Sequence, residues 1–183
     1  MSRLFLPTFI LYLILPGCSF SQTVKKEENP VIHWHSFGEA LELCKTQPRL
    51  IFVDVYAPWC GYCKQMDKRT FSNKEIALYM NAHFYCVKFN AEGMDTIRIN
   101  GQTLVNTAPV NGNAKTHPFA FSLLDGRLGY PSLVFLDATG KRLQYLQSFL
   151  KPSDFEPYLR FMGEGAYKTT SFDAYFKQRN EGK

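Results

Sequence analysis

Apolar residues in this chain gather in short runs that are separated by polar and helix-like stretches. Three of these runs, residues 50–56, 84–89 and 133–136, are rich in β-branched and aromatic side chains. Continuous apolar runs of this length predict strands that are buried on both faces of a sheet. The third run leads through a turn at residues 137–140 into residues 143–149, a pattern that predicts a hairpin.

Helical patterns fill the stretches between the apolar runs. Ser36 and Glu39 stand at the spacing of a capping box and predict a helix over residues 37–45. A second helix is expected to start near Cys60 and to end before residue 72, and residues 75–81 predict a further helical piece. Strands that alternate with helices predict an α/β fold.

Two more helices are predicted near the C-terminus. Ser153 and Glu156 form another capping-box pattern, which would open a packed helix that tolerates Pro157 in its first turn. Residues 170–178 predict a short surface helix.

Length and composition fit one folded domain with an appendage. The chain has 183 residues, of which 45% are hydrophobic and 20% charged, so it is too apolar for intrinsic disorder. Its 16 Phe and 10 Tyr supply the bulk for a core. The net charge of +5 is spread along the chain, which argues against nucleic acid as a partner.

The N-terminus has the pattern of an export signal. Arg3 precedes an apolar run over residues 4–15, which is shorter than the roughly 20 residues of a membrane span. Small residues at positions 19 and 21 predict a signal peptide over residues 1–21, followed by a polar linker over residues 22–32.

The same region carries a second pattern. Residues 15–18 resemble a bacterial lipobox, in which Cys18 would be lipidated and would tether the protein to a membrane, although Pro16 fits that motif poorly. Both outcomes place the mature protein outside the cytoplasm, where disulfides persist.

The chemistry is predicted at two cysteines that are spaced three apart. Cys60 and Cys63 lie in the first turn of a predicted helix that directly follows a buried strand. Free backbone amides and the helix dipole stabilise negative charge there, so the thiol of Cys60 should ionise readily. We expect Cys60, exposed at the helix tip, to attack a substrate disulfide, and Cys63 to release the substrate by attacking the mixed disulfide.

The other internal cysteines bear on whether the CxxC pair binds zinc. A CxxC pair can also be half of a structural zinc site, but such a site needs two further ligands. Cys44 and Cys86 are solitary, so neither a metal nor a cofactor is expected. We interpret these two cysteines as small buried hydrophobic residues, and a second disulfide between them is the alternative.

Several separated segments are similar to the thioredoxin superfamily. Residues 51–64, IFVDVYAPWCGYCK, resemble the family's central strand, active-site loop and helix start. Residues 87–90 resemble the end of the next strand, and residues 129–132 resemble the loop that holds a cis proline. The resemblance covers residues 34–162 and is closest to secreted bacterial thioredoxin-like proteins.

The resemblance implies a thioredoxin-like α/β fold, in which helices flank a central mixed sheet. It places this domain at residues 33–165 and a C-terminal tail at residues 166–183. An insertion over residues 91–128 precedes the cis-proline loop. Its Asn-Gly pairs predict turns or a hairpin, and residues 119–124 predict a helix. A loop this long in a compact domain is usually functional or disordered, and we expect it to recognise partners, with an inert lid as the alternative.

The resemblance also implies an acid beneath the cysteines. Asp54 stands where the family keeps a buried acid under the resolving cysteine, and Lys88 stands where the family often has a lysine near that acid. Burial would raise the pKa of Asp54 and let it take the proton of Cys63. A surface aspartate at a strand end is the alternative, and so is a solvated lysine.

Substrate contacts are implied around the two sulfurs. Pro131 would be cis, and the backbone of Tyr130 would pair with an extended substrate segment. Trp59, Gly61 and Tyr62 would border Cys60 on the substrate side, with a purely structural Trp59 as the alternative.

These observations predict an exported, periplasmic thiol–disulfide oxidoreductase that exchanges protein disulfides through a redox-active Cys60–Cys63 pair, as a reductase or an isomerase. A membrane electron donor would supply it with electrons. Two alternatives stay open: an oxidant that donates its disulfide to folding proteins, and a thioredoxin-fold binding module without turnover.

Overall fold

The computed structural model of the protein describes residues 30–107 and 115–181. The predicted signal peptide, Cys18 and residues 22–29 of the predicted linker lie outside the described residues, as do the insertion's residues 108–114. Within the two described ranges, no helix combines the length and the apolar character needed to cross a membrane.

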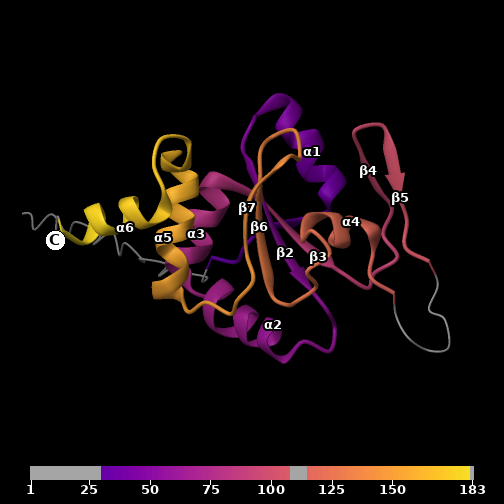
Figure 1. Cartoon of the computed structure of the whole chain (residues 1–183), viewed down its shortest axis with the longest axis horizontal. Helices are drawn as coiled ribbons and strands as arrows, with labels where there is room; N and C mark the ends of the chain where they lie inside the picture. The colour runs from indigo at the N-terminus through magenta and orange to yellow at the C-terminus, as the bar shows by residue number, and fades with distance from the viewer. Residues whose placement is uncertain (1–29, 108–114, 182–183) are drawn as a thin grey trace, which may run out of the picture.

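The main sheet, in the described part of the chain, has five strands in the order β1-β3-β2-β6-β7 (Figure 1). Neighbours β1, β3 and β2 run parallel, whereas β6 is antiparallel to β2 and β7 to β6. The sheet is therefore mixed, as predicted. The strands are β1 (Trp34–His35), β2 (Leu50–Tyr56), β3 (Phe84–Asn90), β6 (Ser132–Leu136) and β7 (Arg142–Leu146).

Helices cover both faces of this sheet (Figure 1). On one face lie α1 (Phe37–Thr46) and α4 (Pro118–Leu123), and on the other lie α2 (Gly61–Met66), α3 (Lys74–His83) and α5 (Pro152–Gly163). Side chains alternate along a strand, so Val53 faces the α1 side whereas Phe52 and Asp54 face the α2 side. A polar side chain is thus placed in the core that lies under α2.

The local sequence explains where most of these elements begin. The predicted capping box is formed at α1, where the N–H of Glu39 donates to Ser36 Oγ at 3.2 Å and the N–H of Ser36 donates to Glu39 Oε2 at 2.8 Å. The predicted strands 50–56, 84–89 and 133–136 are all present. Helix α2 continues as a π-helical turn over Asp67–Phe71, which the sequence pattern does not distinguish from a continued α-helix.

The start of α5 differs from the prediction. The predicted capping box at Ser153 and Glu156 is wrong, because the N-cap is Lys151 and no side chain caps the helix. Pro152 takes the first helical position, for which its fixed φ suits it, and this shifts the start by two residues. The hydroxyl of Ser153 donates to Asp154 instead.

The insertion contains the predicted hairpin and helix. Strands β4 (Ile97–Ile99) and β5 (Gln102–Leu104) pair antiparallel around Asn100 and Gly101, which have φ angles of 51° and 73°. An Asn-Gly pair favours such a turn, since both residues tolerate positive φ.

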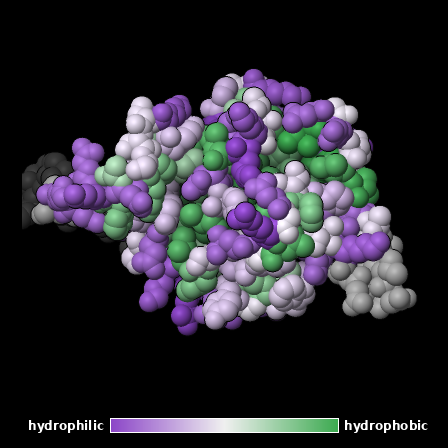
Figure 2. Space-filling model, viewed as in Figure 1, coloured by the Kyte–Doolittle hydropathy of each residue, from purple (hydrophilic) through white to green (hydrophobic). Residues whose placement is uncertain are grey.

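At the other end of the domain, α6 (Phe172–Glu181) covers most of the predicted surface helix and stacks Phe172 on Tyr158 with ring centroids 3.8 Å apart. Figure 2 shows hydrophilic and hydrophobic residues intermixed over the visible face.

Candidate active site

The two predicted redox cysteines form a disulfide at the start of α2. Cys60 and Cys63 are bonded, with Cα atoms 5.3 Å apart. Cys60 is the N-cap of the helix, and its Sγ accepts a hydrogen bond from the backbone N–H of Cys63 at 3.0 Å. A free amide directed at this sulfur is the interaction that stabilises a thiolate once the disulfide is reduced.

Both sulfur-bearing residues are buried. Each cysteine is 4% exposed, and Ala57, Tyr56 and Tyr130 pack against the pair. The expectation that Cys60 is exposed at the helix tip is therefore wrong for this oxidised form. These neighbours therefore bury the disulfide in the oxidised form.

Asp54 is the buried acid that the sequence predicts. It is 1% exposed, and its Oδ2 accepts a hydrogen bond of 3.1 Å from Nζ of Lys88, its direct neighbour across the parallel β2–β3 pair. Its other oxygen, Oδ1, is buried without a hydrogen-bond partner. Burial raises the pKa of Asp54 to about 6, although the charge of Lys88 opposes this shift. The surface-aspartate alternative is wrong.

Lys88 contacts a second acid that the sequence analysis did not identify. Its ammonium also contacts the carboxylate of Asp67, which lies in the π-helical turn and is 44% exposed. Burial alone would lower the pKa of Lys88, but the charge of Asp54 and the contacts with Asp67 outweigh burial and raise it. The ammonium also lies 5.1 Å from the centroid of the Trp34 ring. No motif links Asp67 to Lys88, because the two are 21 residues apart.

The cis-proline loop lies beside the disulfide, as predicted. The Tyr130–Pro131 peptide bond is cis, and Tyr130 packs against the cysteines. Trp59 and Tyr62 are 66% and 62% exposed and border the site. Gly61 opens α2 with open space where a Cβ would lie, so no close contact requires glycine there.

Trp59 is held in place by two contacts. Its ring lies edge-on to Tyr130 with centroids 6.0 Å apart, and its indole N–H donates to Glu92 Oε1 at 2.8 Å. Glu92, which lies in the insertion, was not identified from the sequence, because an acid 33 residues away carries no pattern that points to Trp59. The insertion therefore contacts the border of the site directly.

A cleft of about 450 Å³ lies between Tyr62 of α2 and the cis-proline loop. Tyr62, Pro131, Gln147 and Phe149 are among the residues that line it, with the rings of Tyr62 and Phe149 centred 6.3 Å apart.

The other two internal cysteines take no part in this site. Cys44 and Cys86 are buried and free, as we interpreted them, so the alternative second disulfide is wrong. Burial raises the pKa of Cys86 far above its ordinary value, which leaves this thiol unreactive. Across residues 30–107 and 115–181, no three His, Cys, Asp or Glu side chains lie close enough together to hold a metal ion.

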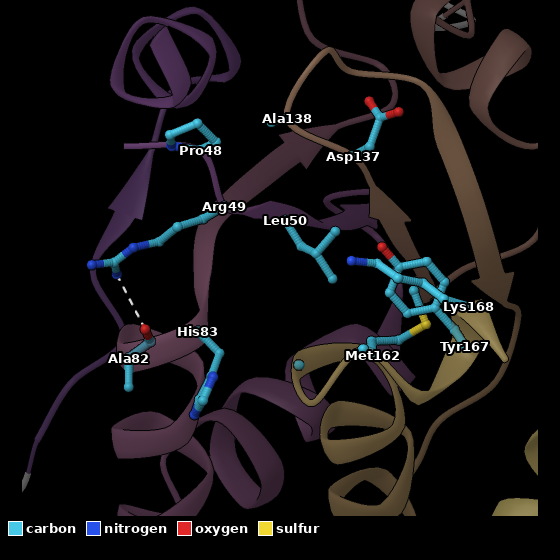
Figure 3. A pocket seen from close by; sticks show the side chains of 12 residues that line it. Pro48, Arg49, Leu50, Ala82, His83, Asp137, Ala138, Met162, Tyr167 and Lys168 are labelled. Atoms are coloured by element: carbon cyan, nitrogen blue, oxygen red, sulfur yellow. Dashed lines mark hydrogen bonds between the residues drawn. The ribbon is translucent and has the colours of Figure 1, made fainter. Parts of the chain in front are cut away.

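A second cleft, of about 430 Å³, lies at the opposite end of the sheet, where β2 begins and β6 ends (Figure 3). Two of its charged side chains, Arg49 and Asp137, make hydrogen bonds to the backbone. Arg49 donates to the carbonyl of Ala82 at 3.2 Å, near the end of α3, and Asp137 accepts from the backbone of Thr139 and Lys141 in the β6–β7 turn. This cleft is remote from the cysteines.

Comparison with known proteins gives a family and several relatives. The family model Thioredox_DsbH, described as "Protein of unknown function, DUF255", matches residues 18–156. The thiol:disulfide interchange protein DsbD of Yersinia enterocolitica is 26% identical over 123 residues, which cover 66% of this chain and 17% of that protein. The chain spans less than a fifth of the length of the curated relatives it matches.

Two solved structures share the fold. A structure described as "DsbH Oxidoreductase" has a TM-score of 0.52 and 20% identity, covering 82% of this chain and 94% of that one. A thioredoxin-fold protein from Helicobacter pylori has a TM-score of 0.56 and 21% identity, covering 74% of this chain and 86% of that one. The predicted thioredoxin-like fold is confirmed by these likenesses.

Proposed function

The chain belongs to the Thioredox_DsbH family, and on that premise we propose that it is an exported enzyme that exchanges protein disulfides through Cys60 and Cys63, as a reductase or an isomerase. One observation carries this proposal. The Sγ of Cys60 caps α2 and accepts the N–H of Cys63, so the helix N-terminus is built around this sulfur.

The first chemical step is attack by Cys60. A free thiol with a pKa near 8.5 is only about 3% thiolate at pH 7, and a pKa lowered to about 7 raises that fraction to roughly half. The Cys60 thiolate attacks one sulfur of a substrate disulfide. A mixed disulfide forms, and the other substrate sulfur leaves as a thiolate that takes up a proton.

The second step is attack by Cys63 on the mixed disulfide. Asp54 accepts the proton of the Cys63 thiol, a role that its burial and its unpartnered Oδ1 support. The Cys63 sulfur then bonds to Cys60, and the substrate's second sulfur leaves. Two electrons pass from the enzyme's dithiol to the substrate, and the enzyme ends as the disulfide found in the structure.

Substrate recognition is assigned to the border of the site. The backbone of Tyr130 would pair with an extended substrate segment beside Pro131, and Trp59, Gly61 and Tyr62 would contact it from the side of α2. The hydrogen bond between Trp59 and Glu92 supports a partner-recognition role for the insertion, because it joins that segment to the border.

The cellular setting is part of the proposal. The apolar run over residues 4–15 supports export to the periplasm, with either cleavage after residue 21 or lipidation of Cys18. A relative that is named as a thiol:disulfide interchange protein supports exchange with protein partners, and a membrane protein as the electron donor is part of our proposal. We keep residues 33–165 as the catalytic domain and residues 166–183 as its tail.

Reduction of insulin disulfides tests the function. Wild type should turn over, whereas Cys60→Ser should be inactive and Cys63→Ser should stop after one mixed disulfide. Cys86→Ala is the matched control, because it removes a buried thiol outside the site. Inactive wild type would favour a binding module.

The reduction potential of the Cys60–Cys63 pair separates reductase from oxidant. We expect a value closer to the roughly −270 mV of a reducing thioredoxin than to the roughly −120 mV of the oxidant DsbA. A value near the latter would favour the disulfide-donating alternative.

A further inference from the structure

One side chain outside the cysteine motif makes three polar contacts around the cis-proline loop. Gln147 directly follows β7, and its carboxamide nitrogen lies 2.7 Å from the carbonyl oxygen of Arg127 and 3.1 Å from that of Gly129. The same nitrogen lies 3.2 Å from Oγ of Ser132. These three partners flank Tyr130 and Pro131 on both sides.

The hydrogen-bond network fixes which end of the carboxamide faces the loop. The two carbonyl oxygens can only accept. The Ser132 hydroxyl donates its own hydrogen to the Gly129 carbonyl at 2.7 Å, so toward Gln147 it also accepts. A donor must therefore stand at this point, and the NH₂ group of glutamine meets that need. A carboxylate of the same shape would face three acceptors.

Gly129 makes room for this contact. A Cβ on Gly129 would lie 2.8 Å from Cδ and 2.9 Å from Nε2 of Gln147. Any larger residue would push the carboxamide away from the loop. Glycine at position 129 and glutamine at position 147 thus form one arrangement, contributed by two segments 18 residues apart.

The arrangement leaves one residue of the loop unpaired. The backbone N–H and C=O of Tyr130 make no hydrogen bond to residues 30–107 or 115–181, while Gly129 and Ser132 beside it are held. Gln147 also lines the cleft of about 450 Å³ between Tyr62 and the cis-proline loop. A backbone segment that is held on both sides but open at its centre is ready to pair with an extended chain, without first losing conformational freedom.

We propose that Gln147 is a positioning residue that fixes residues 127–132 for the capture of extended protein segments, and so sets the affinity for protein disulfides without acting in the exchange itself. This inference rests on the proposed function. Small disulfides that have no peptide backbone to pair with the loop should not depend on Gln147.

Kinetics with two kinds of disulfide test this role. Gln147→Glu keeps the shape and removes the donors, whereas Gly129→Ala keeps the glutamine and displaces it. Each should raise KM for insulin about three- to tenfold, the loss expected for one net hydrogen bond, with kcat little changed. Each should leave kcat/KM for a small aromatic disulfide, 5,5′-dithiobis(2-nitrobenzoate), within twofold of wild type.

Gln144→Glu is the matched control, because Gln144 is exposed on β7, three residues before Gln147, and its substitution makes the same change of charge. It should match wild type with both disulfides. Equal losses with insulin and the small disulfide, or an unchanged KM for insulin in both variants, would overturn the inference.

Hydrogen exchange gives a readout that does not need turnover. The hydrogen-bonded backbone amides of Arg127 and Leu128 should exchange faster in Gln147→Glu and Gly129→Ala than in Gln144→Glu or wild type. Unchanged exchange would overturn the inference. If the two variants exchange faster but wild type reduces neither disulfide, Gln147 still holds the loop, and only the proposed function is overturned.

Discussion

Lys88 donates a hydrogen bond of 3.1 Å to Asp54 from the position directly beside it in the sheet. The same ammonium contacts Asp67 at the surface of the π-helical turn. The ammonium of Lys88 therefore pairs with both a buried and a partly exposed carboxylate. This sharing leaves Asp54 incompletely neutralised, so burial prevails and its pKa rises to about 6.

Asp54→Asn should slow insulin reduction, because an amide cannot accept the proton of Cys63. We expect a loss of about 10²-fold or less, at the lower end for a general base, since thiols can also pass protons to solvent. The first mixed disulfide should still form at the wild-type rate. Asp173→Asn, an exposed change on α6, is the control. Unchanged turnover of Asp54→Asn across pH 6–8 would remove Asp54 from the mechanism.

Stability should depend on pH through the same residue. The native pKa of Asp54 is about 6, above the ordinary 3.8, so between these values the native state binds more protons than the unfolded state. Unfolding free energy of the oxidised protein should therefore fall as the pH rises from 4 to 7, by at most about 3 kcal/mol from this group. Urea unfolding of wild type and Asp54→Asn measures it. The unfolding free energy of Asp54→Asn relative to that of wild type should be higher at pH 7 than at pH 4. A difference that stays constant between these pH values would contradict the assignment.

Asp67→Asn should shift the pH profile of turnover toward lower pH. The negative charge of Asp67 helps to raise the pKa of Asp54, and its loss also frees Lys88 to pair with Asp54 alone. Because Asp67 is partly exposed, the shift should be a fraction of a unit. Asp67→Glu keeps the charge and should keep the wild-type midpoint. A shift toward higher pH would show that Asp67 acts on Asp54 in another way.

The sequence predicts the strands of the sheet correctly where an apolar run is compatible with only one kind of element. Residues 50–56 and 133–136 form central strands whose side chains are buried on both faces, and the pattern contains that information. The start of α5 was misread because two N-terminal signals competed. Pro152 at the first helical position prevailed over a capping box at Ser153.

The predicted part of the site is the part that carries a local motif or a resemblance to a known family. Cys60 and Cys63 follow from their spacing, and Asp54 and Pro131 follow from the family resemblance. Asp67, Glu92 and Gln147 act through contacts with residues at least 15 positions away, so tertiary packing alone brings them to the site. Their side chains are common surface types that form no local pattern.

His117 should hold two parts of the insertion together, and its ring packs edge-on against Phe89 of β3 with centroids 5.1 Å apart. The side chain is fully buried; its Nδ1 accepts the N–H of Phe119 at 3.0 Å, and its Nε2 meets the carbonyl of Asp95 at 2.8 Å. His117→Ala would leave a cavity and unsatisfied backbone groups, and should cost about 2–4 kcal/mol in urea unfolding. His117→Asn can still cap α4 and should cost less. A loss below about 0.5 kcal/mol for His117→Ala would show that the insertion is held elsewhere.

The identity of the sulfur that joins the substrate tests the central claim most directly. Reduced Cys63→Ser and Cys60→Ser are each mixed with insulin, quenched in acid, and mapped by mass spectrometry for the residue in mixed disulfide. Our account predicts that Cys63→Ser accumulates a mixed disulfide at Cys60 that reductant releases, and that Cys60→Ser forms almost none at Cys63. Equal accumulation on the two sulfurs, or none on Cys60 in a folded variant, would contradict the claim that Cys60 attacks and Cys63 resolves.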